Sequence, residues 1–446
     1  MDSSFINTYK NMKRYINACL FIAAFLLVVI AGCKKDEGFK HDDSSPITID
    51  KILPEKGSGG TEILINGSNF TTDTSKIRVT LNGKPLKVVG VNGKQLMVVV
   101  PKKAGSGAIT VTIGDKTATS TSTFTYEYTR TVTTLAGSGV AGFANAQGTD
   151  AMFNFSGESW YRASGIVVDD QLNVYVTDVG NHCIRKIDKD GNVTTFVGNP
   201  NSGGYADGKG TAAKFSIPYG LTIDPEGNLY CVDPGNWDIR KITPDGTASL
   251  LTWANQEPWS VAFDKKSGNV FYTSCNSPGN VYQVTPAGVT SQVIAGLNYP
   301  SGLAFDNKGN LFVTVHGDQL IKKYDSSNWS GTTVAGSGSV GYEDGPAKSA
   351  KFAYPWGMSI DASNNLYIAG NGSGGGSTSN PDQSIRYVDG LTYAVSTFAG
   401  SANAGNVNAV GKAAAFSAPS GVAVDKDGTV YVLDKNNNSI RKIVSE

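Results

Sequence analysis

The sequence predicts an all-β protein in which a small β-sandwich precedes a β-propeller. Three observations predict this fold class. A segment of short strands recurs six times, long helical periodicity is absent, and the chain of 446 residues contains 53 glycines, as tight turns require. Repeats of roughly 40 to 50 residues with four strands each are typical of propeller blades. Such blades must stack, because a single blade cannot bury its own apolar faces.

The best-defined copy of the repeat runs from Pro218 to Ile242, PYGLTIDPEGNLYCVDPGNWDIRKI. Short apolar runs bounded by Gly, Pro, Asp and Asn predict strands at 220–224, 229–233 and 238–242. The copies open at Gly165, Gly220, Ser260, Gly302, Gly357 and Gly421, with spacings of 55, 40, 42, 55 and 64 residues. Each first strand ends on an aspartate that we expect to cap a turn, namely Asp169, Asp224, Asp264, Asp306, Asp361 or Asp425.

These residues resemble NHL repeats, and the resemblance covers about 131–446 and implies a six-bladed propeller. The last copy reaches Glu446 without a fourth strand, whereas a spare strand, TVTTLAG, lies at 131–137 ahead of the first copy. We therefore predict that 131–137 completes the sixth blade. This pairing would join the two ends of the ring and remove an exposed sheet edge.

The N-terminal residues are predicted to be a targeting segment. Basic residues precede an apolar run at 19–32, which is near 14 residues and shorter than the ~20 residues of a membrane-spanning helix. The tetrapeptide Ile30-Ala-Gly-Cys33 resembles a lipobox, so 1–32 is expected to be a lipoprotein signal peptide. The resemblance implies lipidation of Cys33 and an outer-membrane lipoprotein exposed at the cell surface; a transmembrane anchor is the alternative. Residues 33–45 are polar and are predicted to be a flexible tether.

Residues 46–128 form a separate predicted domain of short alternating strands. These are TEILING at 61–67, IRVTLNG at 77–83, LMVVVP at 96–101 and AITVTIG at 108–114. The segments at 54–57, 60–61 and 66–70 resemble the IPT/TIG variety of immunoglobulin-like β-sandwich. We expect this domain to be a spacer before the propeller at 129–446, and direct ligand binding is the alternative.

Composition excludes several classes of function. The 38 basic and 38 acidic residues balance, which argues against nucleic-acid binding. The three cysteines after the N-terminal segment, Cys183, Cys231 and Cys275, are odd in number and lack CxxC spacing. This pattern speaks against a disulfide framework or a zinc site, so buried free thiols are expected.

We assign no catalytic residue and no metal ligand. His182 and His316 are the only histidines of the predicted propeller, so a three-histidine zinc site within it is excluded. A calcium ion on the rim stays open as the one cofactor alternative, held by Asp178, Asp233, Asp434 and backbone carbonyls. No Gly-x-Ser-x-Gly elbow is present.

Four longer connections between blades share a skeleton of glycines followed by Ala-x-Phe. They begin at Ala136, Val197, Ala335 and Ala399 and contain Phe153, Phe215, Phe352 and Phe416. In a propeller such inserts lie on the same rim as the turns between the second and third strands. We expect the inserts to crowd one face and the phenylalanines to anchor them by packing.

The residue before each strand-opening position is predicted to surround the mouth of the central channel on this face. These residues are Ser164, Tyr219, Trp259, Ser301, Trp356 and Ser420, and nearby rim turns add His182, Trp237 and His316, with Trp160 and Tyr161 ahead of the first blade. Aromatic rings at a concave mouth suit stacking on a sugar ring. The predicted ligand-binding residues are Tyr219, Trp237, Trp259, Trp356, His182 and His316. The alternative is that Trp259 and Trp356 fill the channel as core.

Together these features predict a surface-anchored lipoprotein whose propeller captures a polysaccharide for uptake, a function implied by the resemblance to lipoproteins of this domain order. One alternative is a propeller lyase or hydrolase that acts on a glycan or lactone. Another is a protein-interaction scaffold in an outer-membrane transport complex. The expected partners are a glycan and, through the lipid, the membrane, with no nucleic acid.

Overall fold

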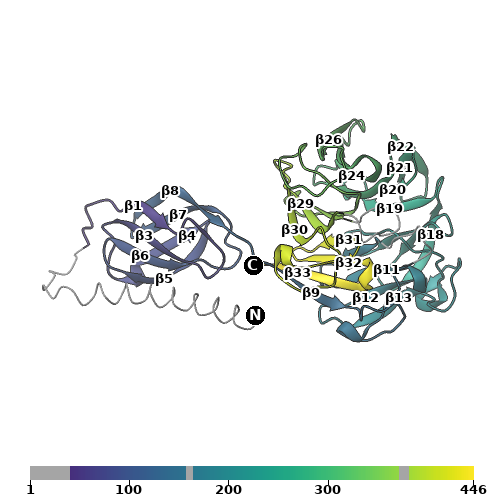
Figure 1. Cartoon of the computed structure of the whole chain (residues 1–446), viewed down its shortest axis with the longest axis horizontal. Helices are drawn as coiled ribbons and strands as arrows, with labels where there is room; N and C mark the ends of the chain where they lie inside the picture. Colours follow the sequence, from purple (N-terminus) through teal and green to yellow (C-terminus); the bar gives the residue numbers. More distant parts are fainter. Residues whose placement is uncertain (1–40, 157–163, 371–380) are drawn as a thin grey trace, which may run out of the picture. The chain divides into compact units, whose positions relative to one another are not determined.

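The computed structural model describes residues 41–156, 164–370 and 381–446, so Cys33, Trp160 and Tyr161 lie outside the described residues. The chain divides into two compact units, Met1–Tyr128 and Thr129–Glu446 (Figure 1). Within the described ranges both units are built from β-strands, and the only helical segments are single 3-10 turns. None of the helical turns described has the length or apolarity to cross a membrane. The all-β class is therefore confirmed.

The first unit is an immunoglobulin-like β-domain. Its strands are β1 (Thr48–Leu53), β2 (Lys56–Gly57), β3 (Glu62–Ser68), β4 (Ile77–Leu81), β5 (Lys84–Val91), β6 (Gln95–Val99), β7 (Gly107–Ile113) and β8 (Lys116–Tyr126). They pair in the order β1-β3-β6-β5-β4-β7-β8-β2. Alternate side chains of β7, including Ile109 and Val111, are buried together with Phe70 and Phe124 in one core. This alternation is the two-faced pattern that the sequence predicts.

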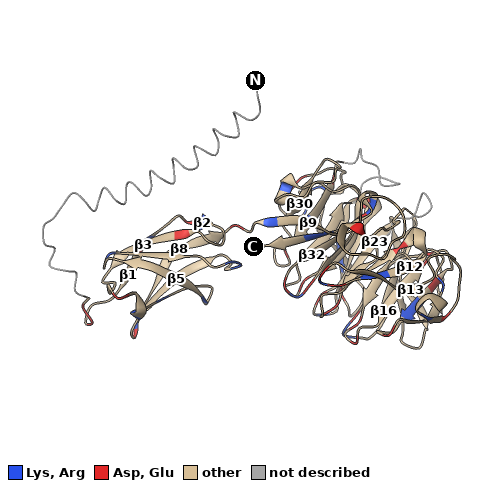
Figure 2. Cartoon of the chain, turned by 90° about the horizontal axis from the view of Figure 1, so that it is seen from below, with Lys and Arg blue, Asp and Glu red and all other residues tan. Residues whose placement is uncertain are grey.

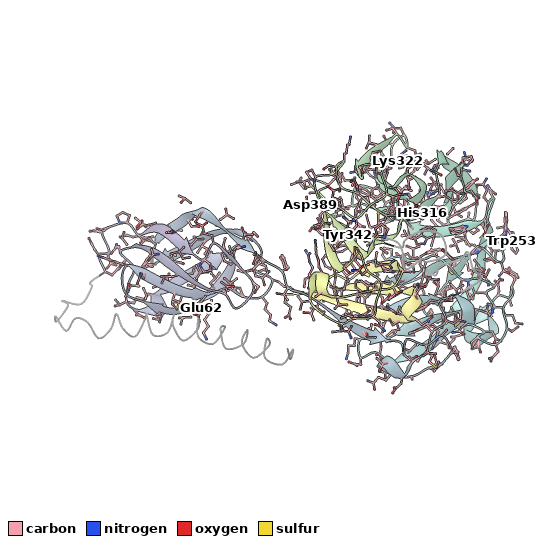
Figure 3. All side chains as sticks on the ribbon, viewed as in Figure 1. Glu62, Trp253, His316, Lys322, Tyr342 and Asp389 are labelled. Carbon is pink, nitrogen blue, oxygen red and sulfur yellow. The ribbon has the colours of Figure 1, made fainter. Side chains whose placement is uncertain are left out.

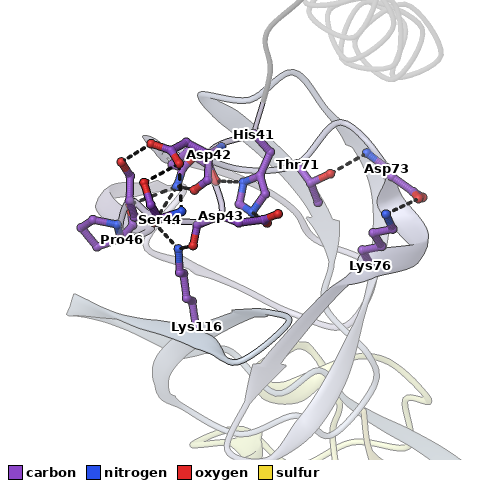
Figure 4. Close-up of polar contacts among 11 residues, drawn as sticks. His41, Asp42, Asp43, Ser44, Pro46, Thr71, Asp73, Lys76 and Lys116 are labelled. Atoms are coloured by element: carbon purple, nitrogen blue, oxygen red, sulfur yellow. Dashed lines mark hydrogen bonds and ion pairs between the residues drawn. The ribbon is translucent and has the colours of Figure 1, made fainter.

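The last residues of the predicted tether, 41–45, make hydrogen bonds to this domain (Figure 4). The side-chain amide of Asn69 donates to the carbonyls of Asp42 (2.9 Å) and Ser45 (2.8 Å). The backbone N–H of Asp42 donates in return to the Asn69 side chain at 2.9 Å. Lys116 donates to the Ser45 carbonyl at 2.8 Å. The composition of this segment could not reveal these bonds, because their partners, Asn69 and Lys116, are distant in the sequence.

The second unit is a six-bladed propeller. We number its sheets blades 1 to 6. Blade 1 contains β10 (Ile166–Val168), β11 (Val174–Asp178), β12 (Cys183–Ile187) and β13 (Val193–Gly198), and blade 2 contains β15 (Leu221–Ile223), β16 (Leu229–Asp233), β17 (Asp238–Ile242) and β18 (Thr247–Trp253), with β14 (Gly208–Lys209) as a fifth strand beside β18. Blade 3 contains β19 (Pro258–Phe263), β20 (Val270–Ser274), β21 (Gly279–Val284) and β22 (Thr290–Leu297), and blade 4 contains β23 (Pro300–Phe305), β24 (Leu311–Val315), β25 (Leu320–Tyr324) and β26 (Gly331–Ala335). Blade 5 contains β27 (Pro355–Ile360), β28 (Leu366–Gly370), β29 (Gln383–Val388) and β30 (Val395–Ser401), and blade 6 contains β31 (Pro419–Val424), β32 (Val430–Asp434), β33 (Ser439–Ser445) and β9 (Arg130–Ala136). All the pairs within them are antiparallel, as short hairpin connections allow.

The predicted closure of the ring is confirmed. Strand β9 pairs with β33, in a register that runs from Ile440 opposite Ala136 to Ser445 opposite Arg130. The backbone N–H of Thr129 donates to the Glu446 carbonyl at 2.8 Å, and the reciprocal bond is 2.9 Å. The sixth blade thus joins the first and last strands of the unit.

Weakening this closure is expected to destabilise the propeller. Val132 of β9 is buried in a cluster with Val432 and Ile443, so Val132→Ala should lower the free energy of unfolding by about 1–3 kcal/mol. Thr133→Ala, on the exposed side of the same strand, is the matched control and should change it by less than about 0.5 kcal/mol. Urea unfolding followed by tryptophan fluorescence measures both. Equal, small effects of the two variants would show that β9 does not hold the ring closed.

The aspartates that end the first strands cap turns, as predicted. Asp224 Oδ1 accepts the backbone N–H of Asn228 at 2.8 Å, and its Oδ2 accepts the hydroxyl of Tyr230 at 3.1 Å. Asp361 makes the same contacts with Asn365 N (2.9 Å) and with the hydroxyl of a tyrosine in the next strand. These carboxylates are occupied within their own blades, so the repeat explains them structurally.

A buried arginine holds each of the four inserts on its blade. The arginines are Arg185, Arg240, Arg386 and Arg441, all fully buried in the third strand of blades 1, 2, 5 and 6. Arg240 is representative: it donates to the carbonyls of Lys214 and Ala206, both at 3.0 Å, and to Asp207 at 2.6 Å. Its guanidinium also lies 5.0 Å from the ring centre of Phe215. The insert phenylalanines are therefore packing anchors, as predicted, and cation–π contact with arginine adds to their packing.

Blades 3 and 4 lack both an insert and this arginine. Tyr282 and Lys322 occupy the equivalent positions, opposite Tyr272 and Val313. The preceding connections are only 254–257 and 298–299. The buried arginine thus occurs in each blade that follows an insert and in neither blade without one. We conclude that the inserts are ordered parts of the fold, each held by its own arginine.

Candidate functional site

The residues predicted at the channel mouth are positioned by close approach of neighbouring blades. The N–H of Gly165 donates to the Tyr219 carbonyl of the next blade at 2.9 Å. A Cβ atom at Gly165 would lie 2.5 Å from that oxygen, and one at Gly302 would lie 2.4 Å from the Trp356 carbonyl. Only glycine fits this contact, which explains why glycine opens most copies of the repeat. The contact also fixes the backbone that carries Tyr219 and Trp356.

Six aromatic side chains from blades 2 to 5 meet here, and we call them the mouth cluster: Tyr219, Trp259, Tyr299, His316, Tyr354 and Trp356. The ring centres of Tyr219 and Trp259 are 5.4 Å apart, and those of Trp259 and Trp356 are 5.9 Å apart. His316 lies edge-on to Trp356 at 4.9 Å and contacts Tyr354 at 5.2 Å. These distances and tilted geometries are those of attractive aromatic pairs. Figure 3 places His316 over the middle of the propeller.

Burial divides the mouth cluster in two. Tyr219 and Trp356 are 1% and 4% exposed and belong to one hydrophobic core cluster, although they come from blades 2 and 5. Their burial agrees with the alternative that large rings fill the channel. Trp259, His316 and Tyr354 are half-buried, and Tyr299 is 45% exposed. These four rings are the part of the cluster that a ligand can contact.

Tyr299 and Tyr354 are members of the mouth cluster that the sequence reasoning missed. Both have left-handed backbone conformations, with φ of 52° and 61°, which are uncommon for large residues and gather at functional positions. The Gln319 side chain accepts the N–H of Tyr354 at 2.5 Å and donates to the His316 carbonyl at 2.8 Å. The available sequence signal is a Tyr-Pro dipeptide whose proline begins the first strand of blades 4 and 5.

The two remaining predicted residues, His182 and Trp237, belong to the turns after the second strands of blades 1 and 2. His182 follows the turn after β11, and its Nδ1 lies 2.6 Å from the Ser216 carbonyl, which accepts the hydrogen bond. Trp237 occupies the corresponding turn of blade 2 and is 51% exposed. No aromatic contact in the part of the chain that the structure describes connects either ring to the mouth cluster.

The three aspartates proposed as calcium ligands are each engaged within a single blade. Asp178 and Asp434 form buried ion pairs with Arg185 (2.7 Å) and Arg441 (2.8 Å). Asp233 accepts the backbone N–H groups of the insert before its blade, at 2.7 Å each. Among the described residues no group of three or more His, Cys, Asp or Glu side chains is arranged to hold a metal ion. These aspartates therefore do not form the shared site that the sequence left open.

Burial dominates the titration of these carboxyl groups. It raises the pKa of Asp434 to about 6, against the opposing hydrogen bond from Asn437 and the charge of Arg441. The pKa of Asp178 is also raised by burial, with the Arg185 guanidinium opposing it. The three cysteines are buried free thiols, as expected, and burial raises the pKa of Cys183 beyond its ordinary range.

A shallow depression of about 370 Å³ lies elsewhere, at the turns between the first and second strands of blades 2 and 3. It is lined by Asp224, Pro225, Glu226, Asn228, Tyr230, Lys241, Phe263, Lys265 and Gly268. In a propeller these turns lie on the rim opposite the inserts. Asp224 already caps its own turn, so we do not assign this depression a function.

Comparison with known protein families identifies both units. Residues 46–128 match the IPT/TIG domain, and residues 161–187 and 416–443 match the NHL repeat. The chain therefore carries an IPT/TIG domain followed by an NHL-repeat propeller of six blades. NHL repeat-containing protein 2 of Homo sapiens is 26% identical over 308 residues, which are 64% of this chain and 39% of that protein. Protein SUPPRESSOR OF QUENCHING 1, chloroplastic, of Arabidopsis thaliana is 25% identical, and the match covers 58% of this chain and 27% of that protein.

Solved structures share the whole two-unit fold. A Bacteroides thetaiotaomicron protein of unknown function has a TM-score of 0.61 at 20% identity, over 92% of this chain and 100% of that one. An auxiliary nutrient binding protein from the same organism has a TM-score of 0.55 at 22% identity, over 91% and 99%. One from Bacteroides ovatus has a TM-score of 0.53 at 20% identity, over 92% and 100%. At these identities the likeness establishes the fold alone.

Proposed function

We propose that the propeller is the ligand-binding part of a surface lipoprotein and that its exposed mouth rings bind a polysaccharide for uptake. The observation that carries the proposal is the half-buried group of Trp259, His316 and Tyr354, with exposed Tyr299 beside it. Flat rings that are fixed by packing against one another match the apolar faces of sugar rings at little entropic cost. The lipobox ending at Cys33 supports the lipid anchor.

Three further observations support this proposal. The mouth is rich in aromatic rings, whereas the nearby buried carboxylates Asp178, Asp233 and Asp434 are held by arginine or backbone N–H groups. Proteins of the same fold include two described as auxiliary nutrient binding proteins. Acidic and basic residues are interspersed along the strands and loops of both units (Figure 2), which favours a neutral ligand over a nucleic acid.

Trp259→Ala is expected to abolish polysaccharide binding or weaken it at least about tenfold, because it removes a partly exposed ring that also supports Trp356. The measurement is isothermal titration of residues 41–446 against a panel of neutral and acidic polysaccharides, with reducing ends assayed in parallel. Trp329→Ala is the matched control, because Trp329 has the same intermediate burial but packs on Phe271, in the turn after the third strand of blade 4.

Three results would redirect the proposal. Equal weakening by both variants would indicate a loss of folding and not of a site. New reducing ends or unsaturated products would promote the lyase or hydrolase alternative. A failure of every polysaccharide to bind would contradict capture and favour the protein scaffold.

A further inference from the structure

The four inserts do not surround the whole of the propeller face on which they lie. Inserts precede blades 1, 2, 5 and 6, whereas only 254–257 and 298–299 precede blades 3 and 4. The face is therefore open over blades 3 and 4. Three of the four accessible members of the mouth cluster lie on this side, because Trp259 opens blade 3 and Tyr299 and His316 belong to blade 4. The fourth, Tyr354, ends the insert before blade 5. Among the described residues the inserts leave this direction uncovered, so a ligand that stacks at the mouth can extend outward over blades 3 and 4.

A second group of exposed aromatic rings lies at the border of this opening, on blade 2. Tyr205 of the insert is 42% exposed and Trp253 at the end of β18 is 53% exposed. Their ring centres are 5.2 Å apart with an angle of 35° between the ring planes. We call this pair the blade 2 platform. Trp237 adjoins it, because its carbonyl accepts the N–H of Ala254, the residue after Trp253, at 2.8 Å.

The platform is held rigidly from below. The Arg240 guanidinium lies 4.9 Å from the ring centre of Tyr205, and the same arginine binds Asp207 two residues further along the insert. Arg240 is fully buried, so Tyr205 rests on a fixed support with its outer side toward Trp253 and solvent. A surface ordered before binding loses little conformational entropy when a ligand arrives.

Trp253 is not explained by packing within the repeat. The equivalent positions in blades 1 and 5 are Gly198, opposite Cys183, and Gly400, opposite Ser384. Both glycines have positive φ, and a Cβ at Gly198 would lie 2.6 Å from a backbone oxygen where the chain enters an insert. The short connection after β18 removes this constraint, and a tryptophan that leaves about half of its surface in water occupies the place.

We infer that Tyr205 and Trp253 form a second stacking site for the same glycan that the mouth binds, so the ligand is a chain of several pyranose units. This inference rests on the proposed function. It commits to a sugar chain because the platform consists of flat aromatic rings, and because only residues 254–258 separate Trp253 from Trp259 of the mouth cluster. Two stacking points on one chain raise the apparent affinity, since the second contact forms intramolecularly.

The test uses the polysaccharide that the wild-type protein binds most tightly in the titration panel, together with its own oligosaccharides of about two to ten units. Trp253→Ala and Tyr205→Ala should each lower the affinity for the polymer about tenfold while leaving the affinity for the disaccharide unchanged. Trp259→Ala should lower both affinities. Affinity of the wild-type protein should rise with chain length, and this rise should be lost in Trp253→Ala.

Phe143→Ala is the matched control. Phe143 holds the position of Tyr205 in the insert of blade 1, is 40% exposed and rests on Arg185 at 4.6 Å, but a glycine stands where blade 2 has Trp253. It should leave every affinity unchanged, and thermal unfolding should be the same in all these variants. Unchanged polymer affinity in Trp253→Ala would overturn the platform while the proposed function stands. A wild-type protein that binds no saccharide would overturn both.

Discussion

Arg386→Ala is expected to destabilise the propeller by about 3–5 kcal/mol, because it leaves a buried carboxylate without its partner. The Arg386 side chain is fully buried; it binds Asp382 and the Lys351 carbonyl at 2.9 Å each, and Asp344 and the Glu343 carbonyl at 3.0 Å each. Removing it therefore takes the positively charged partner from Asp382, which is itself buried and keeps its hydrogen bonds from Ser384, and also releases the third insert.

The measurement is urea unfolding followed by tryptophan fluorescence, which reports this unit because all six tryptophans lie within 129–446. Lys322→Ala is the matched control, since Lys322 holds the equivalent position in blade 4, where no insert exists. It should change the free energy of unfolding by less than about 1 kcal/mol. Comparable losses in the two variants would contradict the clamping role.

Asp238→Asn is expected to stabilise the propeller at and above neutral pH. Asp238 is fully buried, and neither of its carboxylate oxygens has a hydrogen-bond partner within the described ranges. Burial first, and then the charge of Asp233, raise its pKa from 3.8 to about 8. Between these two values the unfolded chain carries the charge while the folded protein keeps the proton. The free energy of unfolding therefore falls as pH rises across this interval.

The asparagine variant removes this loss. Its free energy of unfolding should exceed that of the wild-type protein by on the order of 2–5 kcal/mol above pH ~8 and equal it below pH ~4. Urea unfolding between these limits measures the difference. Asp389→Asn is the contrasting control: hydrogen bonds from the Thr392 backbone and side chain lower the pKa of Asp389, so its loss should destabilise near neutral pH. A parallel pH dependence of wild type and Asp238→Asn would contradict the neutral state of Asp238.

The blades could be predicted from the sequence because their determinants are local. Alternating apolar residues, the turn-capping aspartates such as Asp224 and Asp361, and the spare strand at 131–137 are all visible in one repeat or in the comparison of repeats. The role of the arginines could also have been found, since Arg stands at the centre of the third strand only in blades that follow an insert.

The mouth was predicted only in part, because its makeup depends on contacts across the ring. Trp356 of blade 5 packs in the core cluster of Tyr219 from blade 2, and burial by a distant blade has no local signature. Tyr299 and Tyr354 contact His316 because their backbones adopt left-handed conformations, which cannot be predicted from the residue type. The hydrogen bond between His182 and the Ser216 carbonyl of the neighbouring insert likewise joins residues that are 34 positions apart in the sequence.

The closure of the ring also sets how the propeller bears mechanical load. Tension transmitted along the chain from Tyr128 reaches β9 first, and β9 is held along its whole length by β33. A pull along the strand loads this ladder in shear, so many hydrogen bonds must break together and not one after another. The two end residues, Thr129 and Glu446, bind each other at the point where the force enters. Tension applied from the N-terminal side would therefore load the blade in which the first and last strands of the propeller pair.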